Sequence, residues 1–220
     1  MKFRKITLAL AAVAAMSAMS AQAVNLVVNG GFEATTNGKG QLGFNTNATG
    51  WTNVSGYTFL FTPGTADTSG APGQFGPLSL WGPGNGSANG LALSPTGGNF
   101  IASDGAFQTT PVKQTINGLV TGQKYDLGFD WGAAQQFGFT GATTEQWQVS
   151  LGNETHSTAV INNASHGFSG WKHQVFSFTA TGASEVLSFL AVGTPNGVPP
   201  FALLDGVTLA AAVPSPRPGR

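Results

Sequence analysis

Two carboxylates near opposite ends of the chain, Glu33 and Asp205, are candidate metal ligands. Glu33 follows the turn sequence Asn29-Gly30-Gly31, and glycine-rich turns expose backbone carbonyl oxygens. Asp205 lies in the apolar stretch Phe201–Leu209, where a carboxylate buried without a partner would be costly. Because Ca²⁺ binds carboxylate and carbonyl oxygens, a structural calcium ion would satisfy both residues. The alternative is hydrogen bonding to backbone amides or to a neighbouring lysine, since two carboxylates are few for a tight calcium site.

Aromatic residues at strand ends and in loops form a second candidate site. Trp and Tyr rings stack on the apolar C–H faces of sugars, while amides and carboxylates bond to the sugar hydroxyls. The core is the alternative position for such rings: Trp131 and Trp147 are in phase with inward-facing residues, and we assign Trp147 to the core. The predicted carbohydrate-binding residues are Trp81, the best exposed candidate, with Trp51, Tyr57, Trp171, Gln135 and Gln136; Asn85 and Asp104 are further polar partners.

No pattern in the sequence indicates a catalytic site. His156, His166 and His173 are scattered and lack the spacing of a metalloprotease motif, and no Gly-x-Ser-x-Gly elbow occurs. A glycosidase would need two carboxylates flanking the scissile bond, and no motif designates such a pair. We therefore expect a non-catalytic protein.

Composition narrows the possible partners and cross-links. The 220 residues include 32 Gly and 12 Pro but only 8% charged residues, which suits many short strands joined by tight turns. Without the expected leader, 6 basic and 9 acidic residues remain, a net charge of −3, so no basic surface for nucleic acid is expected. The absence of Cys excludes disulfides, thiolate metal sites and a Cys nucleophile.

The first 23 residues have the pattern of a signal peptide. Lys2, Arg4 and Lys5 give a positive start, and the apolar stretch Ile6–Ala15 is too short to span a bilayer. Ala21-Gln22-Ala23 fits the cleavage pattern, which places the mature start near Val24. An exported protein, extracellular or at the cell surface and with no membrane span in its mature chain, is therefore predicted.

The remaining chain predicts one all-β domain over residues 24–210, a β-sandwich or jelly roll. Two-residue alternation is clearest in Lys124–Trp131 and Glu145–Leu151. Asn25–Glu33 is predicted as the first strand, paired with Phe201–Leu209. Residues 38–99 are turn-rich but carry many aromatics, which favours ordered loops across one face of the sandwich. The other predicted strands are Gly50–Asn53, Tyr57–Phe61, Leu78–Trp81, Asn99–Ser103, Val112–Ile116, Thr155–Ile161, Trp171–Ala180, Glu185–Val192 and Phe201–Ala210; residues 211–220 form a Pro-rich extended tail.

Several stretches resemble exported bacterial proteins of the PEP-CTERM sorting type: Asn25–Glu33, Gly98–Ala102, Gln114–Gly122, Tyr125–Gln136, Trp147–Gly152, Gly167–Trp171 and Phe189–Leu209. The resemblance implies a galactose-binding-like jelly roll related in architecture to carbohydrate-binding modules, which often hold a structural calcium where Glu33 and Asp205 stand. It also implies a link to exopolysaccharide-producing bacteria. The chain departs from the family at Val213-Pro214-Ser215-Pro216, where the usual Glu is missing and no apolar helix follows. Either secretion without anchoring or an altered reading frame would explain this difference.

Together these features predict an exported, non-catalytic protein of the cell surface or extracellular matrix that interacts with polysaccharide. A glycan-active hydrolase or lyase on the same fold and a purely structural matrix protein are the alternatives.

Overall fold

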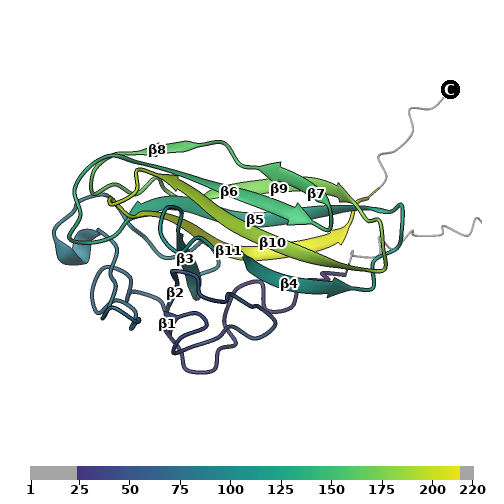
Figure 1. The fold of residues 1–220 in the computed structure, drawn as a ribbon, viewed down its shortest axis with the longest axis horizontal. Coiled ribbons are helices and arrows are strands. Elements are labelled where there is room, and N and C mark those ends of the chain that lie inside the picture. Colours follow the sequence, from purple (N-terminus) through teal and green to yellow (C-terminus); the bar gives the residue numbers. More distant parts are fainter. Residues whose placement is uncertain (1–23, 214–220) are drawn as a thin grey trace, which may run out of the picture.

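The computed structural model describes residues 24–213, which form a sandwich of two antiparallel sheets (Figure 1). The expected signal peptide and the altered sorting motif after Val213 lie outside the described residues. One sheet contains β1 (Gly40–Gln41), β2 (Thr58–Phe61), β3 (Phe100–Asp104), β11 (Pro200–Ala211), β5 (Lys124–Gln135) and β9 (Lys172–Thr179), in that order. The other contains β4 (Val112–Asn117), β10 (Ser184–Thr194), β6 (Thr143–Leu151) and β7 (Glu154–Ser157), with β8 (Ile161–Asn163) also paired to β6. The predicted all-β jelly-roll sandwich is confirmed.

The main core lies between the two sheets, and it follows from the alternation of the long strands. Trp147 and Val149 on β6 are fully buried, whereas Gln148 between them is exposed, as the pleat of a half-buried strand requires. Trp147 packs edge-to-face on Phe189 of β10, and its Nε1–H donates to the carbonyl of Leu203 on β11 at 2.9 Å. This hydrogen bond joins the two sheets, and the assignment of Trp147 to the core is confirmed.

A second apolar layer covers the outer face of the six-stranded sheet. Strands β2, β3 and β11 are buried on both faces, because residues 62–99 fold over the side that would otherwise meet solvent. The contributors from this segment are Ala66, Ala71, Leu78 and Leu80, which pack with residues of the three strands. Ordered loops over one face of the sandwich were predicted from the sequence. The loops are ordered because Ala66, Ala71, Leu78 and Leu80 are buried against the sheet.

The prediction of a first strand at Asn25–Glu33 is wrong, although its expected neighbour is correct. Leu26 N–H donates to the carbonyl of Leu209 at 2.8 Å, and Val207 N–H donates to the carbonyl of Gly30 at 3.0 Å. No strand forms, because Asn29 and Phe32 take positive φ values of 53° and 57°. The segment is an irregular edge beside β11.

Several shorter predictions also differ from the structure. Gly50–Asn53 and Leu78–Trp81 form only isolated bridges, since their turns prevent a continuous ladder. The expected strand Thr155–Ile161 is divided into β7 and β8. A single 3₁₀ turn, η1 (Pro83–Asn85), is the one helical element that the described residues contain, and none of their helices is long and apolar enough to cross a membrane.

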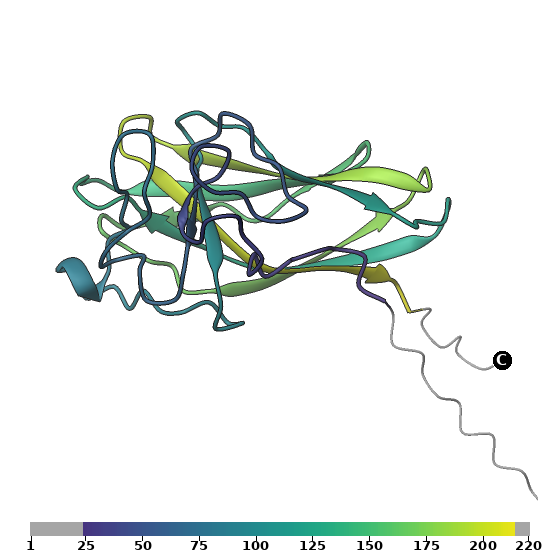
Figure 2. The ribbon, with the colours of Figure 1, turned by 90° about the horizontal axis from the view of Figure 1, so that it is seen from below.

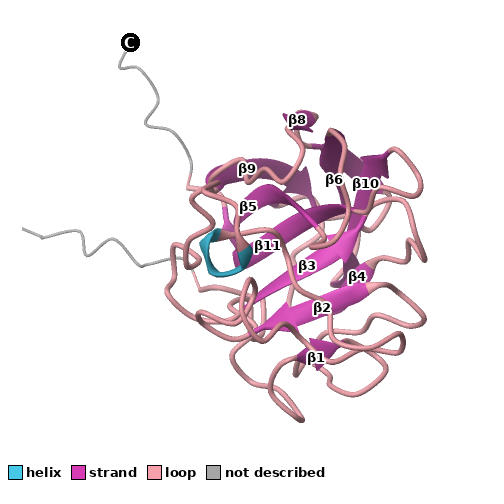
Figure 3. Ribbon diagram, turned by 90° about the vertical axis from the view of Figure 1, so that its left-hand side faces the viewer, coloured by secondary structure: helices cyan, strands magenta, loops and turns pink. Residues whose placement is uncertain are grey.

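The two ends of the described chain leave from the same end of the sandwich (Figure 2). Ala211, the last residue of β11, pairs with Tyr125, whereas Pro200, the first, pairs with Gln135. The opposite end, seen in Figure 3, is built from loops: the turn after β3, the β10–β11 connection and the segment after β5. These loops form the candidate site.

Candidate functional site

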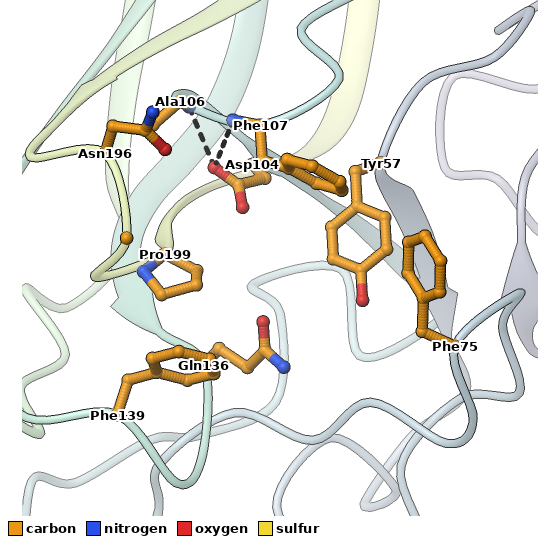
Figure 4. A pocket seen from close by; sticks show the side chains of 10 residues that line it. Tyr57, Phe75, Asp104, Ala106, Phe107, Gln136, Phe139, Asn196 and Pro199 are labelled. Carbon is orange, nitrogen blue, oxygen red and sulfur yellow. Dashed lines mark hydrogen bonds between the residues drawn. The ribbon is translucent and has the colours of Figure 1, made fainter.

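A pocket of about 330 Å³ opens among the loops at the end of the sandwich remote from the chain termini (Figure 4). Asp104 ends β3, Gln136 follows β5, and Pro199 precedes β11, so three neighbouring strands of one sheet position its floor. The lining residues are Tyr57, Phe75, Asp104, Ala106, Phe107, Gln136, Phe139, Asn196, Gly197 and Pro199. Their chemistry is mainly apolar with a few polar groups, which is typical of small-molecule sites.

Three aromatic rings form one wall of the pocket. The ring centroid of Tyr57 lies 6.0 Å from that of Phe75 and 5.3 Å from that of Phe107, and the two phenylalanine rings are 6.1 Å apart. The Phe75 side chain is 68% exposed and that of Phe107 is 42% exposed, although both contact aromatic neighbours. Apolar rings held in water by ordered loops are a surface on which a ligand can stack.

Hydrogen bonds between the loops hold these rings in place. Tyr57 N–H donates to the carbonyl of Gln108 at 3.1 Å, and the Gln74 side chain donates to the Gln108 side chain at 2.7 Å. Gly105 approaches the β10 backbone so closely that an added β-carbon would lie 2.4 Å from the nitrogen of Gly193. A glycine is therefore required where the Phe107 loop leaves β3.

Asp104 is the charged residue of the pocket lining. One carboxylate oxygen, Oδ1, accepts hydrogen bonds from the backbone amides of Ala106 and Phe107 at 2.8 and 3.1 Å. The other, Oδ2, is buried without a partner and points toward the cavity (Figure 4). Burial raises the pKa of Asp104 to about 6, although the two amide bonds oppose the change. Burial, and next the charge of Asp104, raise the pKa of Tyr57, so its hydroxyl remains neutral.

Amide groups complete the polar part of the pocket. The side chains of Gln136 and Asn196 lie on its border, opposite the Tyr57 ring (Figure 4). The Tyr57 hydroxyl also points into the cavity (Figure 4). The pocket therefore offers a buried carboxylate oxygen, two amides and a phenol to a ligand that stacks on the rings.

Of the predicted sugar-binding residues, the structure brings together Tyr57 and Gln136 in this pocket. Trp51 is only 4% exposed, and its ring packs against Phe32 in the main core. Gln135 is fully buried, where its amide donates to the carbonyl of Gly141 and its oxygen accepts from the amide of His166. These two side chains hold the fold and do not line the pocket.

Trp81 and Trp171 are partly exposed but lie outside the pocket lining. Trp81 stacks on His166 with centroids 3.9 Å apart, and its Nε1–H donates to the carbonyl of Phe139 at 2.8 Å. Trp171 packs edge-to-face on Phe100 over the second apolar layer. Trp81 therefore supports the loop that carries Phe139 into the pocket.

The sequence prediction did not select Phe75, Phe107 and Phe139, because it weighted Trp and Tyr as sugar platforms. Phe75 precedes Gly76 and Phe139 follows Gly138, but the buried Trp51 also follows a turn glycine, Gly50, so this pattern does not distinguish exposed rings from core rings. Asp104 was predicted only as a secondary partner. Its position after the strand Asn99–Ser103 and before Gly105 is typical of a functional residue at the end of a strand.

Glu33 and Asp205, the predicted metal ligands, also lie close together. A β-carbon added to Gly31 would lie 3.8 Å from Asp205 Oδ1 and 3.9 Å from Glu33 Oε1. Asp205 Oδ2 accepts hydrogen bonds from the hydroxyls of Ser94 and Thr96, whereas Oδ1 is buried without a partner. Burial raises the pKa of Asp205, and the charge of Glu33 adds to this rise.

The donor set at Gly31 fits a calcium ion in kind. The unpaired Asp205 Oδ1 is an oxygen that a cation would satisfy. The carbonyls of Asn29, Gly30 and Phe32 in the turn already accept hydrogen bonds. Glu33 Oε1 already accepts a hydrogen bond from the backbone amide of Asn99 at 2.7 Å, which is the alternative to calcium binding considered from the sequence. No group of three His, Cys, Asp or Glu residues with metal-site geometry occurs in residues 24–213, so further ligands would be carbonyls or water.

The three histidines lie away from the pocket lining. His156 pairs with Glu154 at 3.0 Å, His173 with Asp130 at 2.9 Å, and His166 Nε2 lies 3.1 Å from the Thr140 hydroxyl. None of them faces Asp104 across the cavity. The pocket lining therefore contains neither a nucleophile–base pair nor a pair of carboxylates.

Comparison with known proteins gives distant similarities of architecture. No protein-family model and no curated protein sequence matches the chain. A structure described as "CBM4 structure and function" is 16% identical, with a TM-score of 0.34, over 70% of this chain and 94% of that one. The CBM22-1 xylan-binding domain of Paenibacillus barcinonensis Xyn10C is 11% identical, with a TM-score of 0.43, over 88% and 97%. The N-terminal cellulose-binding domain of Cellulomonas fimi β-1,4-glucanase C is 16% identical, with a TM-score of 0.35, over 53% and 80%.

Proposed function

We propose that this protein is an exported, non-catalytic polysaccharide-binding protein and that it binds its glycan in the pocket around Asp104. The observation that carries the proposal is the combination of exposed rings at Phe75 and Phe107 with a buried, unpaired Asp104 oxygen. A sugar satisfies both, because its C–H faces stack on rings and its hydroxyls bond to carboxylates and amides.

The experiment is binding to a glycan array that contains neutral, acidic and amino polysaccharides. Phe75→Ala removes a stacking ring, and we expect about tenfold weaker binding of the glycan retained by the wild type. Phe44→Ala is the matched control, because Phe44 is also an exposed phenylalanine but lies outside the pocket lining. Equal losses in both variants, or no binding by the wild type, would overturn the proposal.

A glycan-active hydrolase or lyase is the competing class. A hydrolase of the usual kind needs two carboxylates, and Asp104 is the one carboxylate among the ten lining residues. We therefore expect no new reducing ends and no unsaturated products after incubation with the glycan that binds. Release of such products by the wild type, lost in Asp104→Asn, would assign catalysis to the pocket.

The calcium site is proposed at Glu33 and Asp205, with water or free backbone carbonyl groups as the remaining ligands. The buried, unpaired Asp205 oxygen beside Gly31 supports it. Because the ion would bind only the folded state, it would stabilise the protein by an amount that grows with the logarithm of the free Ca²⁺ concentration relative to Kd. We expect a higher melting temperature in Ca²⁺ than in EDTA, and no such difference in Asp205→Asn. An unchanged melting temperature of the wild type would refute the site.

Export by a cleaved leader is also part of the proposal, as is kinship with the sorting-type matrix proteins that the sequence resembles. The sequence pattern of residues 1–23 supports export. We expect the secreted protein to begin near Val24, which N-terminal sequencing or intact-mass measurement of material from the culture medium would test. A mature chain that retains Lys2 and Arg4 would contradict it.

A further inference from the structure

The pocket around Asp104 has one formal charge, and that charge is negative. Asp104 and Tyr57 are the titratable residues among the ten that line it, and the lining contains no Lys, Arg or His. The carboxylate is only 2% exposed, and the two hydrogen bonds that it accepts come from neutral backbone amides, both to Oδ1. Its charge therefore has no cationic partner in the pocket, and it acts on the cavity through a poorly screened environment.

The walls of the pocket favour a cation as well. The rings of Tyr57, Phe75 and Phe107 lie within 5.3 to 6.1 Å of one another, and their π faces attract positive charge. A cation seated on these rings also compensates the carboxylate at the floor. An ammonium group can interact both with the aromatic rings and with the negative charge of Asp104. A neutral hydroxyl can only donate a hydrogen bond to the carboxylate, without the charge interaction.

We infer that the pocket is specific for a ligand that carries an ammonium group, namely a polysaccharide containing amino sugars with a free amino group. The inference rests on the proposed function, because it names the class of sugar that the same pocket binds. The ammonium group lies over the aromatic wall with its charge toward Asp104. The Gln136 and Asn196 amides at the border bond to the hydroxyls of the same sugar ring.

The test compares three oligosaccharides of equal length by titration calorimetry at pH 7 and about 150 mM salt: glucosamine oligomers, their N-acetylated counterparts and cello-oligosaccharides. We expect the glucosamine oligomers to bind at least about tenfold more tightly than the other two. Equal affinities for all three would overturn the inference and leave the proposed function standing. No binding of any oligosaccharide would overturn both.

Asp104→Asn separates the pocket charge from the general attraction between a polycation and an acidic protein. The asparagine oxygen can still accept the amides of Ala106 and Phe107, so the loop keeps its bonds. Asp67→Asn is the matched control: it also removes one negative charge, and Asp67 accepts the amide of Gly84 at 2.7 Å but lies outside this pocket. We expect the preference for glucosamine oligomers to disappear in Asp104→Asn and to remain in Asp67→Asn. Equal effects of the two variants would overturn the inference.

A ligand with a permanent positive charge does not titrate, so any pH dependence of its affinity comes from the protein. Burial raises the pKa of Asp104, so the carboxyl gains a proton as the pH falls through about 6, while Tyr57 stays neutral. With N-trimethylated glucosamine oligomers, whose charge does not titrate, we expect affinity to fall severalfold between pH 7.5 and pH 5. An affinity that stays constant or rises toward pH 5 would contradict the role of Asp104.

Discussion

The carboxyl group of Glu145 makes the stability of this protein depend on pH. Glu145 lies on β6, on the same buried side as Trp147, and is 1% exposed. Its Oε1 accepts a hydrogen bond from the Thr143 hydroxyl at 2.5 Å, while Oε2 is buried without a partner. Burial therefore raises the pKa of Glu145 from 4.5 to about 8, against the smaller effect of the Thr143 bond.

The direction of the effect follows from proton binding. The unfolded chain releases this proton near pH 4.5, whereas the folded protein keeps it until about pH 8. Between these values the folded state binds more protons, so the free energy of unfolding falls as the pH rises. At about 1.4 kcal/mol per pKa unit, the full difference is about 5 kcal/mol, which is a large part of the stability of an ordinary domain.

Glu145→Gln removes the titration and keeps the shape of the side chain. Denaturant unfolding at pH 4.5, 6, 7.5 and 9 should show the variant gaining stability relative to the wild type, by about 4 kcal/mol over this range. The comparison cancels other titrating groups, including Asp104 and Asp205, because both proteins contain them. Glu154→Gln on β7 is the control: a backbone hydrogen bond from Thr179 lowers the pKa of the partly exposed Glu154, so its effect has the opposite sign and is lost mainly below pH 4.5, and the difference between wild type and this variant should stay nearly constant from pH 4.5 to pH 9. A wild type–Glu145→Gln difference that stays constant within about 1 kcal/mol would refute the reasoning.

Three further substitutions test the packing by denaturant unfolding. Trp147→Phe leaves the buried Leu203 carbonyl without its donor and should cost about 2–4 kcal/mol, and a loss below about 1 kcal/mol would contradict the bond between the sheets. Gly30→Ala puts a β-carbon 1.9 Å from the Val207 carbonyl oxygen and should cost about 2–3 kcal/mol, so a neutral result would contradict the close approach. Phe75→Ala should change stability by less than about 0.5 kcal/mol, because most of the ring is exposed, and a larger loss would make Phe75 a packing residue.

The sandwich was most directly predictable from the strands that have one buried face. The alternation in Lys124–Trp131 and Glu145–Leu151 corresponds directly to β5 and β6, because the pleat sends alternate side chains to core and solvent. Strands β2 and β3 lack such alternation, since the second apolar layer buries their outer face as well, but the predicted strands Tyr57–Phe61 and Asn99–Ser103 still correspond to them within one residue. The segment Asn25–Glu33 was mistaken for a strand because its β-branched residues favour one. The positive φ values at Asn29 and Phe32, which prevent it, are seen only in the structure.

The candidate site was only partly predictable, because its residues come from distant parts of the chain. Tyr57, Asp104 and Gln136 are brought together by the order β2-β3-β11-β5 in one sheet, which local patterns do not reveal. The preference for tryptophan also misled the prediction, since the bulk that makes Trp51 a good sugar platform also makes it a good core residue. The proximity of Glu33 and Asp205 was predicted from other features of the sequence, namely the turn glycines before Glu33 and the apolar neighbours of Asp205.

Strand β11 separates the pocket from the ends of the described chain by its whole length. Twelve residues of strand span roughly 40 Å, with Pro200 beside the pocket and Ala211 beside the termini. A copy immobilised through either end would therefore present its pocket outward, free of the support. Two copies joined end to end would have their pockets facing in opposite directions, which favours bridging between two polymer chains over double attachment to one.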